Sequence, residues 1–246
     1  MNNNRVVVIS GAGAGIGKLA AEHFLNNGDS VVGVDIVDNK SISETLLANK
    51  SFSYQKTDIT STQDVSKLYD FINGEFGRVD VVCNIAGGFG ANCTIEETSE
   101  DDWYKLMDLN LKSIFLMTKY AVPLMKKNNS GRIINIASIA GRQPQGKSCI
   151  TYAASKAGVI GFTKYMAMEL GPFGITVNAV SPSTTLTDRV RAIRSDEDVN
   201  RLKAKIPLGR LAVPEDTVNA IFFLASNEAA FITGMTLDVT GGLYMN

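Results

Sequence analysis

The sequence predicts a protein of the α/β class, with one parallel sheet of about seven strands and helices on both faces. Short runs rich in β-branched residues alternate with longer amphipathic segments, which is the order that βαβ units produce. Runs such as VVVI, VVGV and RIINIA are apolar almost throughout, as in strands that helices cover on both faces. These features are typical of a doubly wound, Rossmann-type sheet. The expected strands are residues 5–10, 30–34, 52–56, 79–84, 132–137, 175–180 and 235–239.

The segments between the expected strands are long enough for right-handed crossover helices. No internal repeat or Pro/Ser-rich linker interrupts the alternation, so we expect a single domain over residues 1–246. Residues 181–213 are the exception, because they lack a helical pattern. We expect this irregular insertion, at about 183–212, to form a mobile cover over the substrate. The expected helices are residues 16–27, 43–49, 62–76, 101–127, 152–170 and 214–226.

Composition narrows the classes of function. The chain has 24 Lys plus Arg against 25 Asp plus Glu, so its net charge of −1 gives no broad field to attract nucleic acid or an anionic membrane. Any phosphate binding must therefore be local. No apolar run reaches the roughly 18 residues that a membrane helix needs. We expect a cytoplasmic protein with neither nucleic-acid nor membrane partners.

Cysteine and histidine counts argue against a metal site. The three cysteines are an odd number without CxxC spacing, which disfavours a disulfide framework and a thiolate zinc site. His23 is the single histidine, so a multi-histidine metal site is excluded and a Ser-His-Asp triad would have to use it. We expect reduced structural thiols and no metal.

A glycine-rich turn, Ser10-Gly11-Ala12-Gly13-Ala14-Gly15-Ile16-Gly17, separates the first strand from the first helix. This context is the one that a dinucleotide-binding turn requires. Gly11 allows a sharp turn, Gly15 lets the backbone approach a pyrophosphate, and Gly17 permits close packing of helix and strand. The free N–H groups at the start of the helix suit phosphate.

Asp35 ends the second strand, about 20 residues after the turn, where its carboxylate can accept hydrogen bonds from both hydroxyls of an adenosine ribose. A 2′-phosphate there would meet the carboxylate at a cost of about 1 to 4 kcal/mol per charge pair, or roughly tenfold to thousandfold in binding. Ala14 and Ile36 occupy the positions where a cation would favour that phosphate. The sequence therefore predicts NAD rather than NADP.

Tyr152 and Lys156 lie four residues apart, which places them one turn apart on one helical face. A nearby cation favours the ionised form of a phenol, and a tyrosinate can act as a base. This pair follows the expected buried strand that ends at Ala137, directly before Ser138. A Tyr/Lys pair at this spacing is usually a surface pair, and its position after the buried strand favours a functional one.

With these motifs in order, the chain from Ser10 to Gly242 resembles the short-chain dehydrogenase/reductase family in its compact form. Three departures from the family pattern are Ile85 in place of Asn, Ser183 in place of Gly and Thr240 in place of Asp. The other segments that carry the resemblance are Asp58-Ile59-Thr60, Asn84-Ile85-Ala86-Gly87, Asn110 and Asn178-Ala179-Val180-Ser181-Pro182.

The resemblance implies roles for individual residues. Tyr152 would be the general acid/base, and Ser138 would hold the substrate oxygen. Lys156 would bind the nicotinamide ribose and lower the pKa of Tyr152, while Asn110 would fix a proton-relay water. Asp58 and Ile59 would touch the adenine, Asn84 to Gly87 the adenosine side, and Thr187 the nicotinamide end. The expected cofactor-binding residues are Gly11, Ala14, Gly15, Ile16, Gly17, Asp35, Ile36, Asp58, Ile59, Asn84, Ala86, Gly87, Tyr152, Lys156 and Thr187.

These roles predict an NAD-dependent enzyme that transfers a hydride between a secondary alcohol or ketone and the nicotinamide. The alternative is a 3-oxoacyl-thioester reductase or a hydroxyacyl-CoA dehydrogenase, because residues 206–210, 231–234 and 241–243 are similar to theirs. Enoyl-thioester reductases are disfavoured, since they use a wider spacing from Tyr to Lys. A non-catalytic NAD-binding protein would be expected to lack one of the four expected catalytic residues, and all four are present: Asn110, Ser138, Tyr152 and Lys156.

The substrate itself is not determined by the sequence. Several cations near the expected site could meet an anionic substrate group, and several apolar residues could instead line a pocket for a cyclic or aliphatic alcohol. The expected helix 152–170 is apolar nearly all round, which indicates a homo-oligomer contact, in a tetramer or dimer. The cations are Arg142, Lys147, Arg189, Arg191 and Arg194, and the apolar residues are Phe89, Ile139, Ile150 and Leu186.

Overall fold

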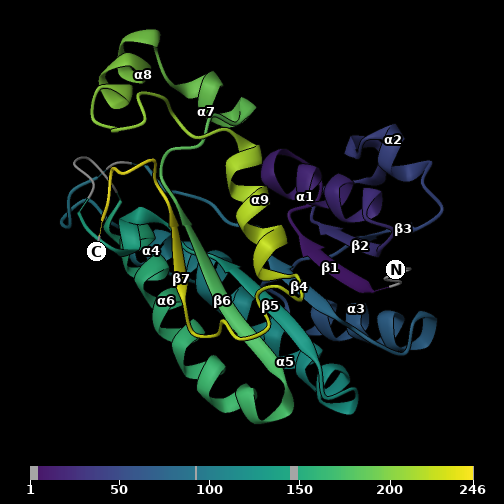
Figure 1. Cartoon of the computed structure of the whole chain (residues 1–246). Coiled ribbons are helices and arrows are strands. Elements are labelled where there is room, and N and C mark those ends of the chain that lie inside the picture. Colours follow the sequence, from purple (N-terminus) through teal and green to yellow (C-terminus); the bar gives the residue numbers. More distant parts are fainter. Residues whose placement is uncertain (1–4, 92, 145–148, 246) are drawn as a thin grey trace.

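The computed structural model describes residues 5–91, 93–144 and 149–245, apart from the side chain of Arg189. Its centre is a seven-stranded sheet in the order β3-β2-β1-β4-β5-β6-β7, in which every pairing is parallel (Figure 1). The predicted doubly wound sheet is therefore confirmed. The strands are β1 Val6–Ser10, β2 Ser30–Asp35, β3 Phe52–Lys56, β4 Val81–Asn84, β5 Gly131–Ile136, β6 Ile175–Pro182 and β7 Thr236–Val239.

Helices cover both faces of the sheet, with α1 and α9 on one face and α3, α5 and α6 on the other (Figure 1). Short 3-10 turns at Asn39–Ser41, Ile139–Gly141 and Gly171–Phe173 connect them to neighbouring elements. The α-helices are α1 Gly15–Asn26, α2 Glu44–Leu47, α3 Thr62–Glu75, α4 Glu100–Met107, α5 Ser113–Lys127, α6 Ile150–Leu170, α7 Asp188–Ile193, α8 Asp196–Lys203 and α9 Pro214–Leu224.

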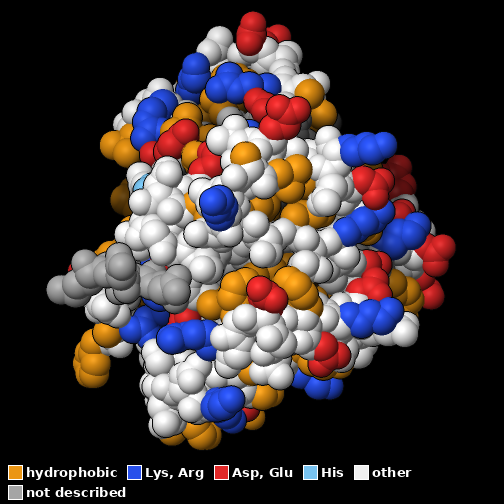
Figure 2. All heavy atoms as spheres, turned by 90° about the vertical axis from the view of Figure 1, so that its right-hand side faces the viewer, with side chains coloured by type: hydrophobic (Ala, Val, Ile, Leu, Met, Phe, Trp, Pro, Cys, Tyr) orange, Lys and Arg blue, Asp and Glu red, His pale blue; other side chains and the backbone are white. Residues whose placement is uncertain are grey.

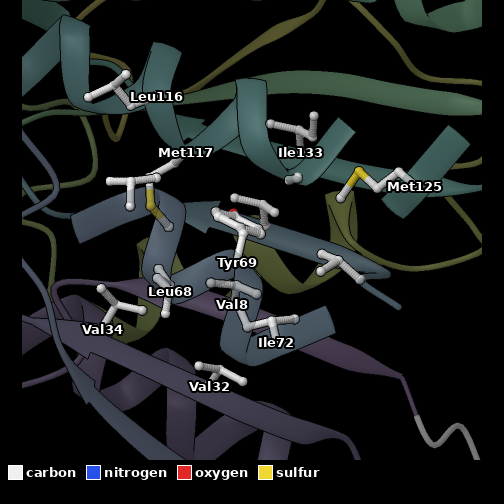
Figure 3. Packing of buried hydrophobic residues seen from close by; sticks show 14 of the residues in the cluster. Val8, Val32, Val34, Leu68, Tyr69, Ile72, Leu116, Met117, Met125 and Ile133 are labelled. Atoms are coloured by element: carbon white, nitrogen blue, oxygen red, sulfur yellow. The ribbon is translucent and has the colours of Figure 1, made fainter. Parts of the chain in front are cut away.

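Alternate residues of β1 belong to two hydrophobic clusters, one on each face of the sheet. Val8 packs with residues of α3 and α5, whereas Val7 and Ile9 belong to the cluster that includes α1 and α9. Figure 3 shows the first cluster, with Val8 below Tyr69 and beside Leu68. Because successive strand side chains point to opposite faces, an apolar run is what a sheet covered on both sides requires.

The predicted helix 101–127 is wrong in its middle. Helix α4 ends at Met107, and a π-helical turn, η2 Asp108–Lys112, precedes α5. A π turn inserts one extra residue into a helix and is frequent at functional sites. Here it contains Asn110, whose side chain is fully buried.

The insertion 181–213 is less irregular than its sequence suggests. Strand β6 continues to Pro182, and α7 and α8 lie within the segment, which projects beyond the sheet at the top of Figure 1. Ser195 caps α8 by accepting a hydrogen bond from Asp198 N. Both helices are too short and too polar to show the apolar periodicity that predicts a helix.

The strand order reverses at β1, because the chain runs outward to β2 and β3 and then returns to β4 on the other side. In such sheets ligands bind in the crevice beyond the carboxyl ends of the strands at this switch point. The turn after β1 and the loop after β4 are therefore neighbours.

No helix in the described part of the chain is long and apolar enough to cross a membrane. On the face drawn in Figure 2, basic and acidic side chains are interspersed, as the balanced composition predicts. Among the described residues, no group of three or more metal-ligating side chains gathers.

Candidate active site

The glycine turn has the backbone shape that its residues permit. Gly11 has φ +77°, a conformation that costs other residues energy, and its N–H donates to Val34 O over 2.8 Å. A Cβ on Gly17 would lie 2.0 Å from the Gly11 carbonyl oxygen. Helix α1 therefore packs against the turn itself as well as against the strand, so Gly17 cannot carry a side chain without moving the helix.

The start of α1 is open to a ligand. Ala14 occupies the N-cap position and no described side chain caps the first N–H groups, which leaves them available to phosphate. Gly15 has φ +54°, and a Cβ there would lie 3.6 Å from Thr187 Cγ2. A hollow of about 220 Å³ lies here, bordered by α1, Thr187 and the start of α9. The free N–H groups at the start of α1 suit a pyrophosphate, whereas the hollow beside them is also bordered by the carboxylates of Glu22, Asp188 and Glu215.

Asp35 is fixed by two backbone donors at the end of β2. Its Oδ2 accepts a hydrogen bond from Gly13 N over 2.9 Å, and its Oδ1 accepts one from Ile36 N over 2.7 Å. A Cβ on Gly13 would lie 2.8 Å from Asp35 Oδ2. The sequence analysis did not predict this contact of Gly13 with Asp35, although the place of Gly13 in the turn was the available signal.

The expected adenine contacts lie beside Asp35. Thr57 N donates to Asp35 O over 2.8 Å, which brings the end of β3 to this corner of the crevice. Asp58 Oδ1 accepts hydrogen bonds from the Thr60 N–H and hydroxyl. Ile36 is exposed, whereas Ile59 belongs mostly to the core. The structure therefore leaves little of the Ile59 side chain available to a ligand.

The loop after β4 lies against the glycine turn. Ser10 Oγ accepts hydrogen bonds from Ile85 N over 3.0 Å and Ala86 N over 3.2 Å. A Cβ on Gly11 would lie 3.0 Å from Ala86 N. Asn84 is buried and donates to Asn135 Oδ1 over 2.8 Å. The side chain of Asn84 therefore supports the loop from beneath.

Asn110 holds the end of this loop from the opposite side. Its Oδ1 accepts a hydrogen bond from Gly88 N and its Nδ2 donates to Gly88 O, each over 2.9 Å. A Cβ on Gly87 would lie 2.8 Å from Asn110 Oδ1 and 3.5 Å from Lys156 Nζ. The π turn thus brings Asn110, Gly87 and Lys156 together.

Ser138 and Tyr152 approach each other from β5 and α6. Ser138 Oγ accepts a hydrogen bond from Ala140 N over 3.2 Å, which leaves the hydroxyl hydrogen free to point elsewhere. Burial raises the pKa of Tyr152, and a hydrogen bond with Ser138 partly offsets this increase. Burial of the phenol therefore raises the pKa of Tyr152 in the protein chain alone, and its lowering by Lys156 stays a prediction.

Lys156 is also buried close to Tyr152. Its Nζ donates to Ile136 O over 2.7 Å and lies 5.9 Å from the centre of the Tyr152 ring. Burial lowers the pKa of Lys156 from its ordinary value of 10.5 to about 8. The ammonium is therefore held by a backbone carbonyl, while burial destabilises its charged form.

The structure separates the cations suggested as substrate contacts. Arg142 forms a bidentate ion pair with Asp238, so it is not free to meet a substrate. Arg191 and Arg194 are exposed, while Lys147 and the Arg189 side chain lie outside the described residues. Of the suggested apolar residues, Ile139 is buried, Leu186 is partly buried, and Phe89 and Ile150 are about half exposed.

Comparison with known proteins agrees with this geometry. The family described as enoyl-(acyl carrier protein) reductase matches residues 11–244. The chain belongs to the short-chain dehydrogenase/reductase family. It is an oxidoreductase with a nicotinamide cofactor, as the sequence predicts.

Several relatives match over their full length. The chain is 39% identical over 244 residues to the 3-oxoacyl-[acyl-carrier-protein] reductase of Escherichia coli (strain K12), covering 98% of both chains. It is 34% identical to the acetoacetyl-CoA reductase of an Acinetobacter species, covering 100% of both. The ligand-free aldohexose dehydrogenase of Thermoplasma acidophilum has a TM-score of 0.88 at 32% identity, covering 98% of this chain and 94% of that one.

The burial of Lys156 predicts a stability cost. Because the folded protein favours the neutral amine, the cost is fully present below pH 8 and disappears as the pH rises toward 10.5. It corresponds to roughly 3 kcal/mol at pH 7, against about 1 kcal/mol for the hydrogen bond to Ile136. Lys156→Met should therefore raise the free energy of unfolding at pH 7 by about 2 kcal/mol.

Urea unfolding of both proteins at pH 7 and pH 9.5 checks this expectation, with the exposed Lys164→Met on the same helix as the control. The advantage of Lys156→Met should shrink by about 2 kcal/mol between the two pH values. A variant that is less stable than the wild type at pH 7 would show that burial of the ammonium carries no such cost.

Proposed function

We propose that this protein is an NAD-dependent dehydrogenase that interconverts secondary alcohols and ketones, with Tyr152 as its general acid/base. The observation that carries the proposal is the meeting of Ser138, Tyr152 and Lys156 beside the dinucleotide turn. Tyr152 bonds to Ser138, and Lys156 lies against Gly87, the end of the loop that also contacts the turn. Asn110 completes the group through its hydrogen bonds to Gly88.

Each of these residues has a defined task. Ser138 donates its hydroxyl hydrogen to the substrate oxygen, and the hydrogen bond from Ala140 N helps to orient its Oγ. Tyr152 accepts the proton of the carbinol during oxidation and returns it to the oxyanion during reduction. Lys156 stabilises the tyrosinate, and its raised acidity allows it to pass on a proton near neutral pH. Asn110 orders the loop after β4 through Gly88. By the family resemblance, it also holds the water that relays the proton.

NAD, when bound, supplies the nicotinamide that accepts or donates the hydride. The residues that would hold it are Gly11 and Ala14 to Gly17 at the phosphates, Asp35 and Ile36 at the adenosine ribose, and Asp58 and Ile59 near the adenine. Asn84, Ala86, Gly87 and Thr187 would complete the site, with Tyr152 and Lys156 at the nicotinamide ribose. The fit rests on the uncapped helix, the positive φ angles and the absence of Cβ atoms at the turn.

The preference for NAD over NADP rests on Asp35. Its two backbone donors fix the carboxylate in one orientation, so it cannot swing away from a 2′-phosphate without losing both hydrogen bonds. Lys56, which pairs with Asp35 in the β2–β3 register, has its ammonium 2.5 Å from Asp38. The ammonium of Lys56 is therefore already paired with the Asp38 carboxylate and does not favour a 2′-phosphate.

A second candidate function is reduction of 3-oxoacyl thioesters or oxidation of the matching hydroxyacyl thioesters. The relatives at 39% and 34% identity carry the names 3-oxoacyl-[acyl-carrier-protein] reductase and acetoacetyl-CoA reductase. Both candidates use the same proton chemistry, so the residues of the active site do not distinguish them. The substrate decides between them.

We further propose that the chain forms a homo-oligomer, a tetramer or dimer, through α6. Tyr165 and Met168 on the outer side of α6 are 60% and 70% exposed. An apolar groove of about 340 Å³ lies between the π turn, Phe115 of α5 and Phe162 of α6. The one-domain organisation over residues 1–246, the covering role of residues 183–212, the cytoplasmic location and the absence of nucleic-acid partners also remain predictions.

Cofactor choice is tested by fluorescence titration with NADH and NADPH. We expect NADH to bind at least tenfold more tightly, and Asp35→Ala to reduce the difference because the repulsion of a 2′-phosphate is removed. Asp101→Ala, which removes an exposed carboxylate at the start of α4, is the control and should keep the preference for NADH. Equal or tighter NADPH binding by the wild type would reject the preference for NAD.

The substrate class is tested with NAD and a panel of secondary alcohols and 3-hydroxyacyl thioesters, together with the ketones in reverse. The first candidate predicts that kcat/KM for the best free alcohol exceeds that for every thioester. If thioesters are turned over and free alcohols are not, the second candidate is correct.

Tyr152→Phe separates chemistry from binding. Removing the phenol oxygen should lower kcat by about a hundredfold or more, because proton transfer by a positioned side chain contributes this much. The dissociation constant for NADH should stay within about threefold, since the ring still fills its place. Tyr165→Phe, an exposed tyrosine on the same helix, should keep full turnover. Full turnover by Tyr152→Phe would contradict the mechanism for either substrate class.

A further inference from the structure

The short turn that follows Ser138 is held between two elements. Residues Ile139–Gly141 form a 3-10 turn that begins at Ser138, and Arg142 is its C-cap. The serine hydroxyl belongs to the same turn, since it accepts a hydrogen bond from Ala140 N. Any displacement of this turn therefore moves the serine hydroxyl relative to Tyr152.

On one side the turn lies directly against α6. A Cβ on Gly141 would lie 2.6 Å from the carbonyl carbon of Lys156 and 2.7 Å from Ala157 N. The backbone of the turn thus contacts the helix at the level of Lys156, one helical turn beyond Tyr152. This contact sets a minimum distance between the turn and the helix but does not hold them together.

On the other side, Arg142 attaches the turn to β7. Arg142 Nε donates to Asp238 Oδ1 over 3.2 Å, and Nη2 donates to Asp238 Oδ2 over 2.9 Å and to Thr236 O over 3.0 Å. Both side chains are mostly buried, at 15% and 16% exposure. A bidentate pair fixes direction as well as distance, and it is stronger where water is partly excluded.

The guanidinium also lies over the ring of Tyr244, 5.6 Å from its centre. Thr240 Oγ1 donates to Tyr244 O over 3.1 Å, so the tail after β7 is held against the same arginine. Arg142 therefore links the Ser138 turn, β7 and the residues that follow it.

We propose that Arg142 is a positioning residue for the reaction, which holds Ser138 at Tyr152 through its ion pair with Asp238. This inference rests on the proposed function, because it assigns Ser138 the substrate oxygen. Arg142 does not bind the substrate. Asp238, on β7, has the same positioning role because it is the partner of Arg142.

The test uses Arg142→Met and the milder Arg142→Lys, which keeps the charge but loses the planar fork. Arg5 offers a matched control, because it forms a bidentate pair with Asp29 and donates to a backbone carbonyl, that of Ala225. It lies just before β1, at the amino end of the sheet, away from the glycine turn that follows the strand. Arg5→Lys therefore changes the same chemistry without touching the Ser138 turn.

Two measurements are made on each variant. Steady-state kinetics with the best substrate of the panel should show kcat lowered about tenfold to hundredfold in Arg142→Met, less in Arg142→Lys, and unchanged in Arg5→Lys. The KM and the dissociation constant for NADH should stay within about threefold. Hydrogen exchange should show faster exchange of the amides of residues 140–143 in Arg142→Met, with the amides of β1 unaffected.

The results distinguish a failure of the positioning role of Arg142 from a failure of the proposed function. If kcat and the exchange of residues 140–143 stay at wild-type values in Arg142→Met, the positioning role is wrong. If KM rises for an anionic substrate while kcat is kept, Arg142 binds substrate and the inference is equally wrong. If the wild type binds neither NADH nor NADPH, the proposed function fails, and hydrogen exchange alone still decides whether Arg142 holds the turn.

Discussion

Two hydrogen bonds between the Asn110 amide and the backbone of Gly88 hold the centre of this molecule together. They join the loop after β4 to the π turn between α4 and α5, and a buried amide that satisfies both of its polar groups in this way is fixed in one orientation. The loop in turn contacts the glycine turn through Ser10 and faces Lys156 through Gly87. The cofactor cradle and the catalytic helix therefore share one support.

The π turn makes this support possible. In an uninterrupted α-helix over residues 101–127, the side chains after Met107 would be rotated relative to their present positions, because the extra residue shifts the helical phase. The shift directs Asn110 into the interior while α5 keeps Leu116 and Met117 on the sheet. Packing on both sides of the interruption holds an arrangement that is uncommon in isolation.

The site is also costly to fold. Lys156 and Tyr152 are both buried, and burial moves the pKa of each toward its neutral form. The glycine turn leaves the N–H groups at the start of α1 without side-chain partners. A protein selected only for stability would avoid these features, whereas a ligand that brings its own charge can compensate for them.

The sequence by itself determined the sheet and the class of cofactor, and it predicted the side chains that we propose to be catalytic. Apolar runs, the glycine turn and the Tyr152/Lys156 spacing are local patterns, and local patterns follow from backbone geometry and the periods of helix and strand. The tertiary structure decided what depends on distant partners. The π turn at Asn110, the pairing of Arg142 with Asp238, the clamp of Asp35 by Gly13 and the raised pKa of Tyr152 each need two segments brought together by folding. The sequence pattern of one segment does not show which distant segment will pack against it, so these features could be found only in the folded molecule.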